Sequence, residues 1–207
     1  MKHEWRKHEK RLYLPKCTPT LIKVDQYKYL CLKGNGNPND DNFTKSIQCL
    51  YNLSYAIRAL IKNEFNDEYT VYPLEGLWEL TEAGKKKAKL DKNELVYTLM
   101  IRQPDLINEA IFHQVLAITK FKKPNPLLND VYLDEIEDGL SVQIMHIGSY
   151  DNEAESFHQL ALFLEEHHLQ RKSARHREIY LSDARKCSPD RLKTVLRYSV
   201  TDNFDKK

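Results

Sequence analysis

The sequence lacks the short motifs by which several large classes of enzyme are recognised. It has no HExxH motif, no GxSxG turn for a nucleophilic serine and no GK[ST] phosphate loop. Its four cysteines form no CxxC pair and show no spacing typical of a disulfide scaffold; they are Cys17, Cys31, Cys49 and Cys187. These absences argue against a structural zinc, a serine triad and a P-loop, so we expect neither a metal nor a cofactor.

Glycine and long apolar runs are also scarce. Only 6 glycines occur in 207 residues, and Gly34-Asn35-Gly36 lacks the third glycine of a dinucleotide-binding fingerprint. We interpret that segment as a strand-to-helix turn with glycines at positive φ, matched later in the chain by Gly148. No signal peptide and no apolar run of membrane-spanning length is recognisable, so we expect a reduced, cytoplasmic protein without a membrane partner.

A strong charge of one sign is absent as well. Lysine and arginine number 32 against 30 aspartates and glutamates, which gives a formal net charge of +2. This balance provides no field for capturing phosphates and predicts no direct binding to nucleic acid. What the chain has in quantity is tyrosine, with 12 residues. A flat ring with a polar hydroxyl suits a pocket for a planar, partly polar ligand, although strands favour aromatic residues in any protein.

The chain shows the same four-element pattern twice. Each copy consists of a strand, a glycine turn, a helix with an acidic start and two further strands. The first copy has strands at residues 27–33, 69–80 and 94–102, with a helix at about 43–62 after Asp40 and Asp41. The second copy has strands at residues 140–147, 175–181 and 192–200, with a helix that starts at 152–155.

This repeat predicts an α+β fold of duplicated strand-helix-strand-strand modules, related by a pseudo-twofold axis, with a bridging helix. We expect a charged, solvated N-terminal extension at residues 1–16, held down by its apolar end, and a single domain at 17–207. Module one covers about residues 17–104, the bridging helix about 105–123 and module two about 127–201. A ligand is expected in a cleft where the modules meet.

Glu75 is one of two glutamates that lie inside apolar, aromatic strands. A carboxylate held among aromatic rings is costly unless a partner neutralises it or the protein uses it. Gly76, the next residue, indicates a bulge or the close approach of another group. Trp78, in the same strand, is a candidate wall of a pocket, with burial in the core as the alternative.

Glu178 is the second such glutamate. Strand alternation places His176, Glu178 and Tyr180 on one face of their strand. A carboxyl group walled by apolar rings is desolvated, which favours its protonated form and suits a general acid or base near neutral pH. The alternative is an exposed face on which Glu178 pairs with Arg175 or Arg197.

Five stretches, in their order along the chain, resemble the GyrI-like small-molecule-binding family. They are PLEGLW at 73–78, MIRQP at 100–104, VQIMHIGSYD at 142–151, HREIYLSD at 176–183 and TVLRY at 194–198. The resemblance implies the duplicated fold, with the helices on one side of the sheets and a ligand cleft between the modules. Members with an attached DNA-binding domain sense hydrophobic or cationic drugs. This sequence has no obvious helix-turn-helix extension and resembles the stand-alone, bacterial members.

The resemblance also implies a function. Some stand-alone relatives detoxify DNA-alkylating natural products of the yatakemycin and duocarmycin type by hydrolysing their cyclopropane. The alternatives are a non-catalytic binder or sensor of hydrophobic or cationic drugs and a protein that interacts with DNA gyrase. The glutamate of the last module carries over onto Glu178, which we predict to be catalytic. The predicted ligand-binding residues are Tyr55, Glu75, Trp78, His146, Tyr150 and Tyr180, with His146 or a tyrosine hydroxyl as donor to a developing oxyanion.

Overall fold

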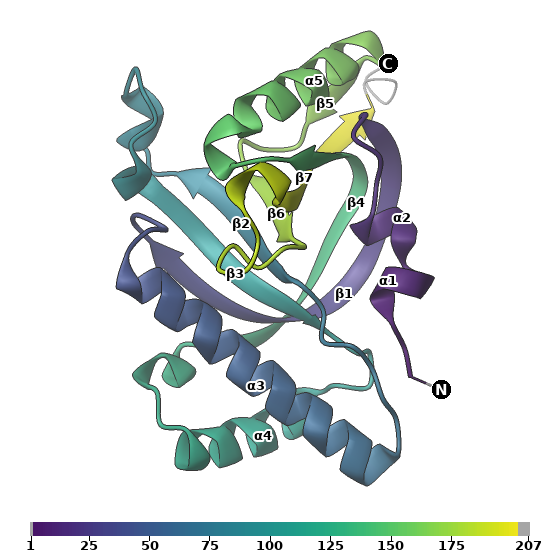
Figure 1. Ribbon diagram of the computed structural model, residues 1–207, viewed down its shortest axis with the longest axis vertical. Coiled ribbons are helices and arrows are strands. Elements are labelled where there is room, and N and C mark those ends of the chain that lie inside the picture. The colour runs from purple at the N-terminus through teal and green to yellow at the C-terminus, as the bar shows by residue number, and fades with distance from the viewer. Residues whose placement is uncertain (1, 203–207) are drawn as a thin grey trace. The chain divides into compact units, whose positions relative to one another are not determined.

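The computed structural model describes residues 2–202 and combines helices with antiparallel strands, which confirms the α+β class (Figure 1). The chain forms two compact units. Unit 1 comprises Met1–Glu4 and Tyr27–Ile136, and unit 2 comprises Trp5–Gln26 and Glu137–Lys207. Two long strands, β1 (Thr20–Asn35) and β4 (Tyr132–Ile147), contribute residues to both units. The predicted pseudo-twofold axis and the predicted division into modules and a bridging helix stay predictions.

Unit 1 is built around β3 (Leu95–Gln103), which pairs antiparallel with β1 on one side and β2 (Leu74–Leu80) on the other. The helix α3 (Asp41–Phe65) packs against β3, and α4 (Glu109–Lys122) packs along α3 (Figure 1). β2 is shorter than the strand predicted at residues 69–80, because Pro73 has no N–H to donate to a ladder. Asp40 is at the N-cap of α3, but its side chain accepts no capping hydrogen bond within residues 2–202.

Unit 2 repeats this topology. Its central strand β7 (Lys193–Asp202) pairs antiparallel with β4 and β6 (His176–Tyr180), and a short strand, β5 (Leu169–Arg171), joins its far end. The helix α5 (Glu153–Glu166) packs on the face that carries Val142, Ile144 and Leu196. In each unit, therefore, the first strand pairs with the last one. The predicted turn glycines Gly36 and Gly148 have φ of 96° and 144°, as expected, whereas Gly34 belongs to β1 and is not at positive φ.

The N-terminal segment differs from the solvated extension that its charge predicts. It forms two short helices of unit 2, α1 (Trp5–His8) and α2 (Lys10–Tyr13). Trp5 and Tyr13 are each 2% exposed, with ring centroids 5.1 Å apart, and the guanidinium of Arg6 lies 4.3 Å from the Trp5 ring. The burial of Tyr13 agrees with an apolar anchor, but the burial of Trp5 was not predicted.

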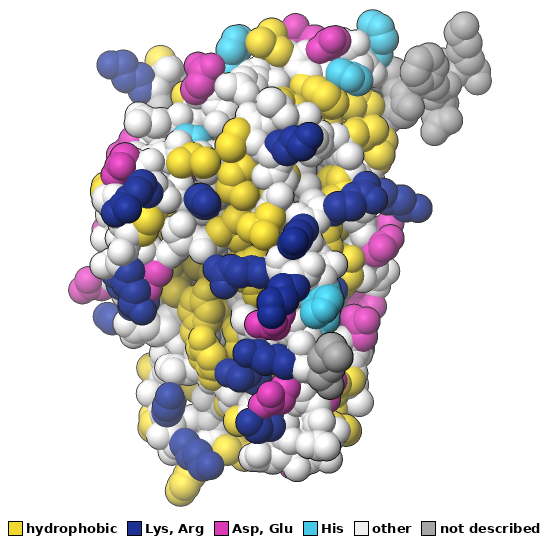
Figure 2. All heavy atoms as spheres, turned by 45° about the vertical axis from the view of Figure 1, so that its right-hand side comes forward, with side chains coloured by type: hydrophobic (Ala, Val, Ile, Leu, Met, Phe, Trp, Pro, Cys, Tyr) yellow, Lys and Arg dark blue, Asp and Glu magenta, His cyan; other side chains and the backbone are white. Residues whose placement is uncertain are grey.

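The remaining elements are short 3-10 helices at Gly84–Lys86, Lys92–Glu94, Pro126–Asn129, Tyr150–Asn152 and Pro189–Arg191. Within residues 2–202, no helix combines the length and the apolar character that crossing a membrane requires. On the face shown in Figure 2, lysine and arginine side chains are interspersed with acidic and apolar ones.

Candidate active site

Glu178 lies on β6 with one hydrogen-bonding neighbour on each side. Oε1 of Glu178 is 2.9 Å from Nε2 of His176, and the hydroxyl of Tyr180 donates to Oε2 at 2.7 Å. These side chains are two residues apart along an extended strand and so share a face, as the alternation predicts. The side chain of Glu178 is only 12% exposed. Both oxygens of a largely buried carboxylate are therefore held in place.

The predicted alternative was an exposed face on which Glu178 pairs with Arg175 or Arg197; the exposure and the pairing with Arg197 are both wrong. Glu178 is opposite Leu196 in the register between β6 and β7, so Arg197 points to the other face of the sheet. There Arg197 Nη1 lies 3.2 Å from Oδ2 of Asp138, and Arg177 Nη2 lies 2.7 Å from Oδ1. Burial alone would raise the pKa of Asp138, but the two guanidinium groups outweigh it and hold that pKa below its usual range.

The start of α5 and the turn before it face the same strand. The ring of Tyr150 meets that of Tyr180 edge-on with centroids 5.9 Å apart, and the ring of Phe157 meets that of His176 edge-on at 5.0 Å. Tyr180 and His176 are also the two residues that make hydrogen bonds to Glu178. Contacts from α5 and its preceding turn thus enclose Glu178 from both sides.

Glu153 lies between these two contacts along the chain and is a residue of the candidate site that the sequence did not predict. Its residue exposure is 7%. Burial raises the pKa of Glu153 to about 9, with further contributions from the negative charges of Glu178 and Asp151. This shift favours the protonated form of Glu153. Its sequence context gave no signal, because a glutamate in the first turn of a helix is explained by the helix dipole alone.

Tyr150 and Tyr180 provide the aromatic part of the site. The pKa of Tyr150 is raised to about 12, first by burial and then by the negative charges of Glu153 and Glu178. Its hydroxyl therefore keeps its proton and can donate a hydrogen bond to a ligand. We call His176, Glu178 and Tyr180 of β6, with Tyr150 and Glu153, the Glu178 cluster.

His146, a predicted ligand-binding residue of β4, is buried and engaged at both ring nitrogens. Nδ1 lies 2.9 Å from the hydroxyl of Ser156 on α5, and Nε2 lies 3.1 Å from the carbonyl oxygen of Ser149. Because a carbonyl only accepts, Nε2 carries the proton. His146 thus links β4, the following turn and α5. Its contact with a ligand stays a prediction.

The other predicted residues lie in unit 1. Glu75 is 1% exposed on β2 and pairs in register with Met100. Trp78 is buried on the opposite face, with its ring 5.0 Å from that of Tyr97. A Cβ added to Gly76 would lie 2.5 Å from Nε1 of Trp78, which confirms the predicted close approach of another group. The glycine lets the indole lie flat across the strand.

Tyr55 is 54% exposed on α3 and stacks with Tyr51 at 6.2 Å between centroids. Tyr51 itself anchors the start of β2, because its hydroxyl accepts the N–H of Leu74 at 3.2 Å. The ligand-binding roles of Tyr55, Glu75 and Trp78 stay predictions.

The two embedded glutamates occupy different positions in the repeated topology. In unit 1, Tyr97 pairs with the residue two positions before the turn glycine Gly36. In unit 2, Thr194 pairs with the residue two positions before the turn glycine Gly148, so Tyr97 and Thr194 occupy equivalent positions. From that register Gly76, not Glu75, is equivalent to Glu178. A shift of one residue moves a side chain to the other face. The carboxyl group on the helix-covered face therefore occurs at this position in unit 2 and has no counterpart in unit 1.

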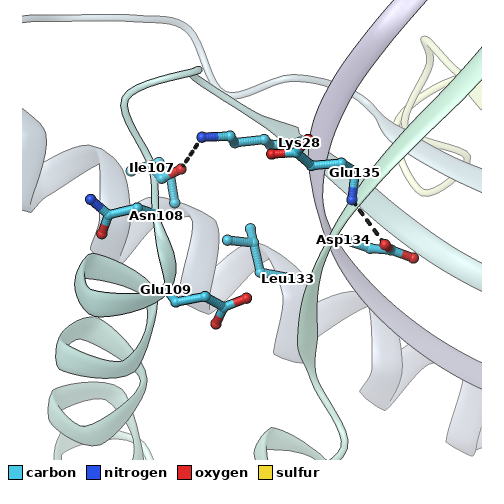
Figure 3. Close-up of a pocket in the computed structure, with 7 residues that line it drawn as sticks. All are labelled: Lys28, Ile107, Asn108, Glu109, Leu133, Asp134 and Glu135. Atoms are coloured by element: carbon cyan, nitrogen blue, oxygen red, sulfur yellow. Dashed lines mark hydrogen bonds between the residues drawn. The ribbon is translucent and has the colours of Figure 1, made fainter.

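A cavity of about 430 Å³ in unit 1 contains none of the predicted site residues (Figure 3). Three of its seven lining residues are acidic, Glu109, Asp134 and Glu135, and the ammonium of Lys28 donates to the carbonyl oxygen of Ile107 at 2.7 Å. Because its cation is already satisfied by the backbone, we do not assign the cavity to the site. Among the described residues, no three histidine, cysteine or carboxylate side chains are grouped to hold a metal ion.

Comparison with known proteins identifies similar domains. The model of the GyrI-like small molecule binding domain matches residues 18–198. The structure of an uncharacterized conserved protein from Listeria innocua is 32% identical, covers 96% of this chain and 100% of its own, and has a TM-score of 0.89. A hydrolase from the same organism is 30% identical with the same coverage and a TM-score of 0.86. A hydrolase encoded by lin2189 is 32% identical, covers 97% of this chain and 100% of its own, and has a TM-score of 0.87. Comparison with curated proteins finds no match.

Proposed function

Because this chain belongs to the GyrI-like small-molecule-binding family, we propose that its Glu178 cluster hydrolyses the cyclopropane of planar alkylating agents of the yatakemycin and duocarmycin type. The observation that carries this proposal is the Glu178 carboxylate, which His176 and Tyr180 hold in place at a largely buried position. Two structures at 30% and 32% identity are those of hydrolases, which supports a hydrolytic reaction.

The reaction requires few catalytic groups, because the substrate is itself reactive. A cyclopropane conjugated to a dienone is strained and electrophilic at its CH₂ carbon. Water attacks that carbon, the C–C bond of the ring breaks, and its electron pair moves to the carbonyl oxygen, which becomes a phenolate and then a phenol. Glu178 takes a proton from the attacking water as a general base. The hydroxyl of Tyr150, which stays protonated, stabilises the oxygen that gains charge.

Aromatic rings position such a substrate. Tyr150 and Tyr180 meet edge-on beside the carboxylate, so either ring can offer a face or an edge to a planar ligand. Fixing the dienone next to an oriented water supplies the proximity on which the rate depends. The proposal therefore needs no metal and no cofactor, and its partner is a planar, hydrophobic small molecule.

The substitution Glu178→Gln tests this assignment. It keeps the shape of the side chain and removes the base, so turnover of a cyclopropane-bearing alkylator is expected to fall about 100-fold or more while the intact compound still binds. Mass spectrometry of the reaction mixture follows both. The matched control is Glu155→Gln, which removes the same charge at an exposed position of α5. Equal turnover by wild type and Glu178→Gln would contradict the role of Glu178.

Capture of an organic cation is the second candidate function. Two neighbouring carboxyl groups beside tyrosine rings favour a positively charged ligand that also contacts the faces of the rings. Binding of such a cation would release the proton of Glu153. In that case Glu178→Gln weakens the binding of cationic ligands by about 1–3 kcal/mol and leaves neutral ligands unaffected. Isothermal titration with matched cationic and neutral dyes measures this difference in binding. The turnover assay separates the two functions, because a sensor converts no substrate.

Interaction with DNA gyrase is a weaker alternative. Recognition by a protein that binds DNA favours an acidic or otherwise strongly charged surface. The near balance of charges, and the mixture of basic and acidic side chains on the face in Figure 2, give no such surface.

A further inference from the structure

We propose that Glu153 and Glu178 act as one acid–base pair, in which Glu153 gives a proton to the substrate oxygen while Glu178 takes one from water. This inference rests on the proposed hydrolysis and assigns a second catalytic residue to it. It also defines the substrate class further: an electrophile with a carbonyl oxygen that gains a proton when the ring opens.

The geometry of the two elements places Glu153 opposite Glu178. Along the chain, Tyr150 and Phe157 precede and follow Glu153, and their rings contact Tyr180 and His176. Along β6, the same Tyr180 and His176 follow and precede Glu178. The two aromatic contacts thus join the start of α5 to β6, one on each side of Glu153 and Glu178. The carboxyl group of Glu178 is close enough for its negative charge to raise the pKa of Glu153.

The hydrogen bonds distinguish the two carboxyl groups. Both oxygens of Glu178 have partners on its own strand. Oε1 of Glu153 is fully buried and has no hydrogen-bond partner within the part of the chain that the structure describes. A buried polar atom without a partner is unusual in a folded protein and indicates a site that a ligand group completes. In our proposal that group is the carbonyl oxygen of the substrate.

Electrostatics explains why one carboxyl group is an acid and the other a base. Two close carboxyl groups do not both ionise readily, so the pair retains one proton at neutral pH. Burial and the charges of Glu178 and Asp151 raise the pKa of Glu153 to about 9. The positive end of α5 favours an anion, but such an effect is worth about 1.5 pKa units at most. His176 and Tyr180 make hydrogen bonds to the two oxygens of Glu178.

The proton balance of the reaction closes within the pair. Water loses one proton to Glu178 as its oxygen bonds to the ring CH₂ carbon. The broken C–C bond leaves its electron pair on the carbonyl oxygen, which takes the proton of Glu153. After turnover Glu178 is protonated and Glu153 is ionised. Transfer of one proton from Glu178 to Glu153, directly or through solvent, restores the starting state, and neither oxidant nor reductant is needed.

Titration of the wild-type protein tests the pair without any substrate. The carboxyl carbons of isotope-labelled glutamates are followed by NMR as the pH rises. One glutamate is expected to titrate at about 9, and its signal is expected to be missing in Glu153→Gln. In Glu178→Gln the same titration is expected to move down by about one pH unit or more, because the neighbouring negative charge is gone. The exposed control Glu155→Gln leaves it in place. The proposed pair is contradicted if Glu153 titrates in the usual glutamate range, or if its pKa is the same in wild type and in Glu178→Gln.

Turnover separates this inference from the proposed function. With a cyclopropane-bearing dienone as the substrate, Glu153→Gln is expected to reduce kcat about 100-fold with little change in binding. The wild-type rate is expected to decline as the pH rises past about 9, where Glu153 loses its proton. Full activity of Glu153→Gln alongside an active wild type overturns the role of Glu153 and leaves the hydrolase proposal standing. A wild-type protein that converts none of these substrates overturns both.

Discussion

The buried acid Glu153 makes the stability of this protein depend on pH. The pKa of Glu153 in the folded chain, about 9, lies above that of a glutamate in an unfolded chain. The folded state therefore holds a proton that the unfolded state releases. This contribution is complete below the unfolded pKa and is lost as the pH rises through about 9. We predict that the melting temperature of the wild type falls by several degrees relative to Glu153→Gln between about pH 6 and about pH 10. Parallel curves for the two proteins would contradict the burial of this acid.

Strand pairing in unit 2 depends on a buried ionic cluster. Asp138 of β4 joins Arg177 of β6 to Arg197 of β7, and Arg197 also donates to Oε1 of Gln143 at 2.8 Å. Removing the carboxylate takes away the negative charge that the buried guanidinium groups of Arg177 and Arg197 share. We predict that Asp138→Asn lowers the free energy of unfolding by about 3–5 kcal/mol, measured by urea denaturation.

The control for this prediction is Asp134→Asn, an exposed position of the same strand. Because the pKa of Asp138 is lowered, its stabilisation is present above the unfolded pKa and is lost as the pH falls through the folded one. The difference between wild type and Asp138→Asn should therefore shrink in acid. A loss of stability that is equal for Asp134→Asn and Asp138→Asn would be inconsistent with the cluster.

For individual strands and helices, local periodicity predicts which residues share a face, but it does not predict the pairing register. Alternation predicted that His176, Glu178 and Tyr180 share a face, because a period of two depends only on neighbouring residues. That Glu75 and Glu178 occupy positions one residue apart in the repeated topology could not be predicted, since register is set by contacts with strands far away in the sequence. Glu153 was missed for a related reason. Its burial depends on how α5 packs over β6, which no local pattern records.

Across the whole molecule, the fold is duplicated but the carboxyl pair is not. Each unit has the strand-helix-strand-strand order and the same antiparallel pairing. The position of Glu178 in unit 2 is held by Gly76 in unit 1, where the indole of Trp78 covers the strand instead. The fold was therefore predictable from the repeated pattern, and the family from the resemblance of five stretches of the sequence. The N-terminal helices were not, because a buried Trp5 within a highly charged segment forms no amphipathic period.

Turnover in isotopically labelled water tests the central claim, hydrolysis at the Glu178 cluster, most directly. A cyclopropane-bearing dienone is incubated with wild type, Glu178→Gln or the control Glu155→Gln, and the product is analysed by mass spectrometry. The account predicts a product that has gained one labelled water at the former ring CH₂ with wild type and control, and about 100-fold less of it with Glu178→Gln. An alkylator that stays intact with the wild type, or a labelled product formed equally fast by Glu178→Gln, would contradict the account.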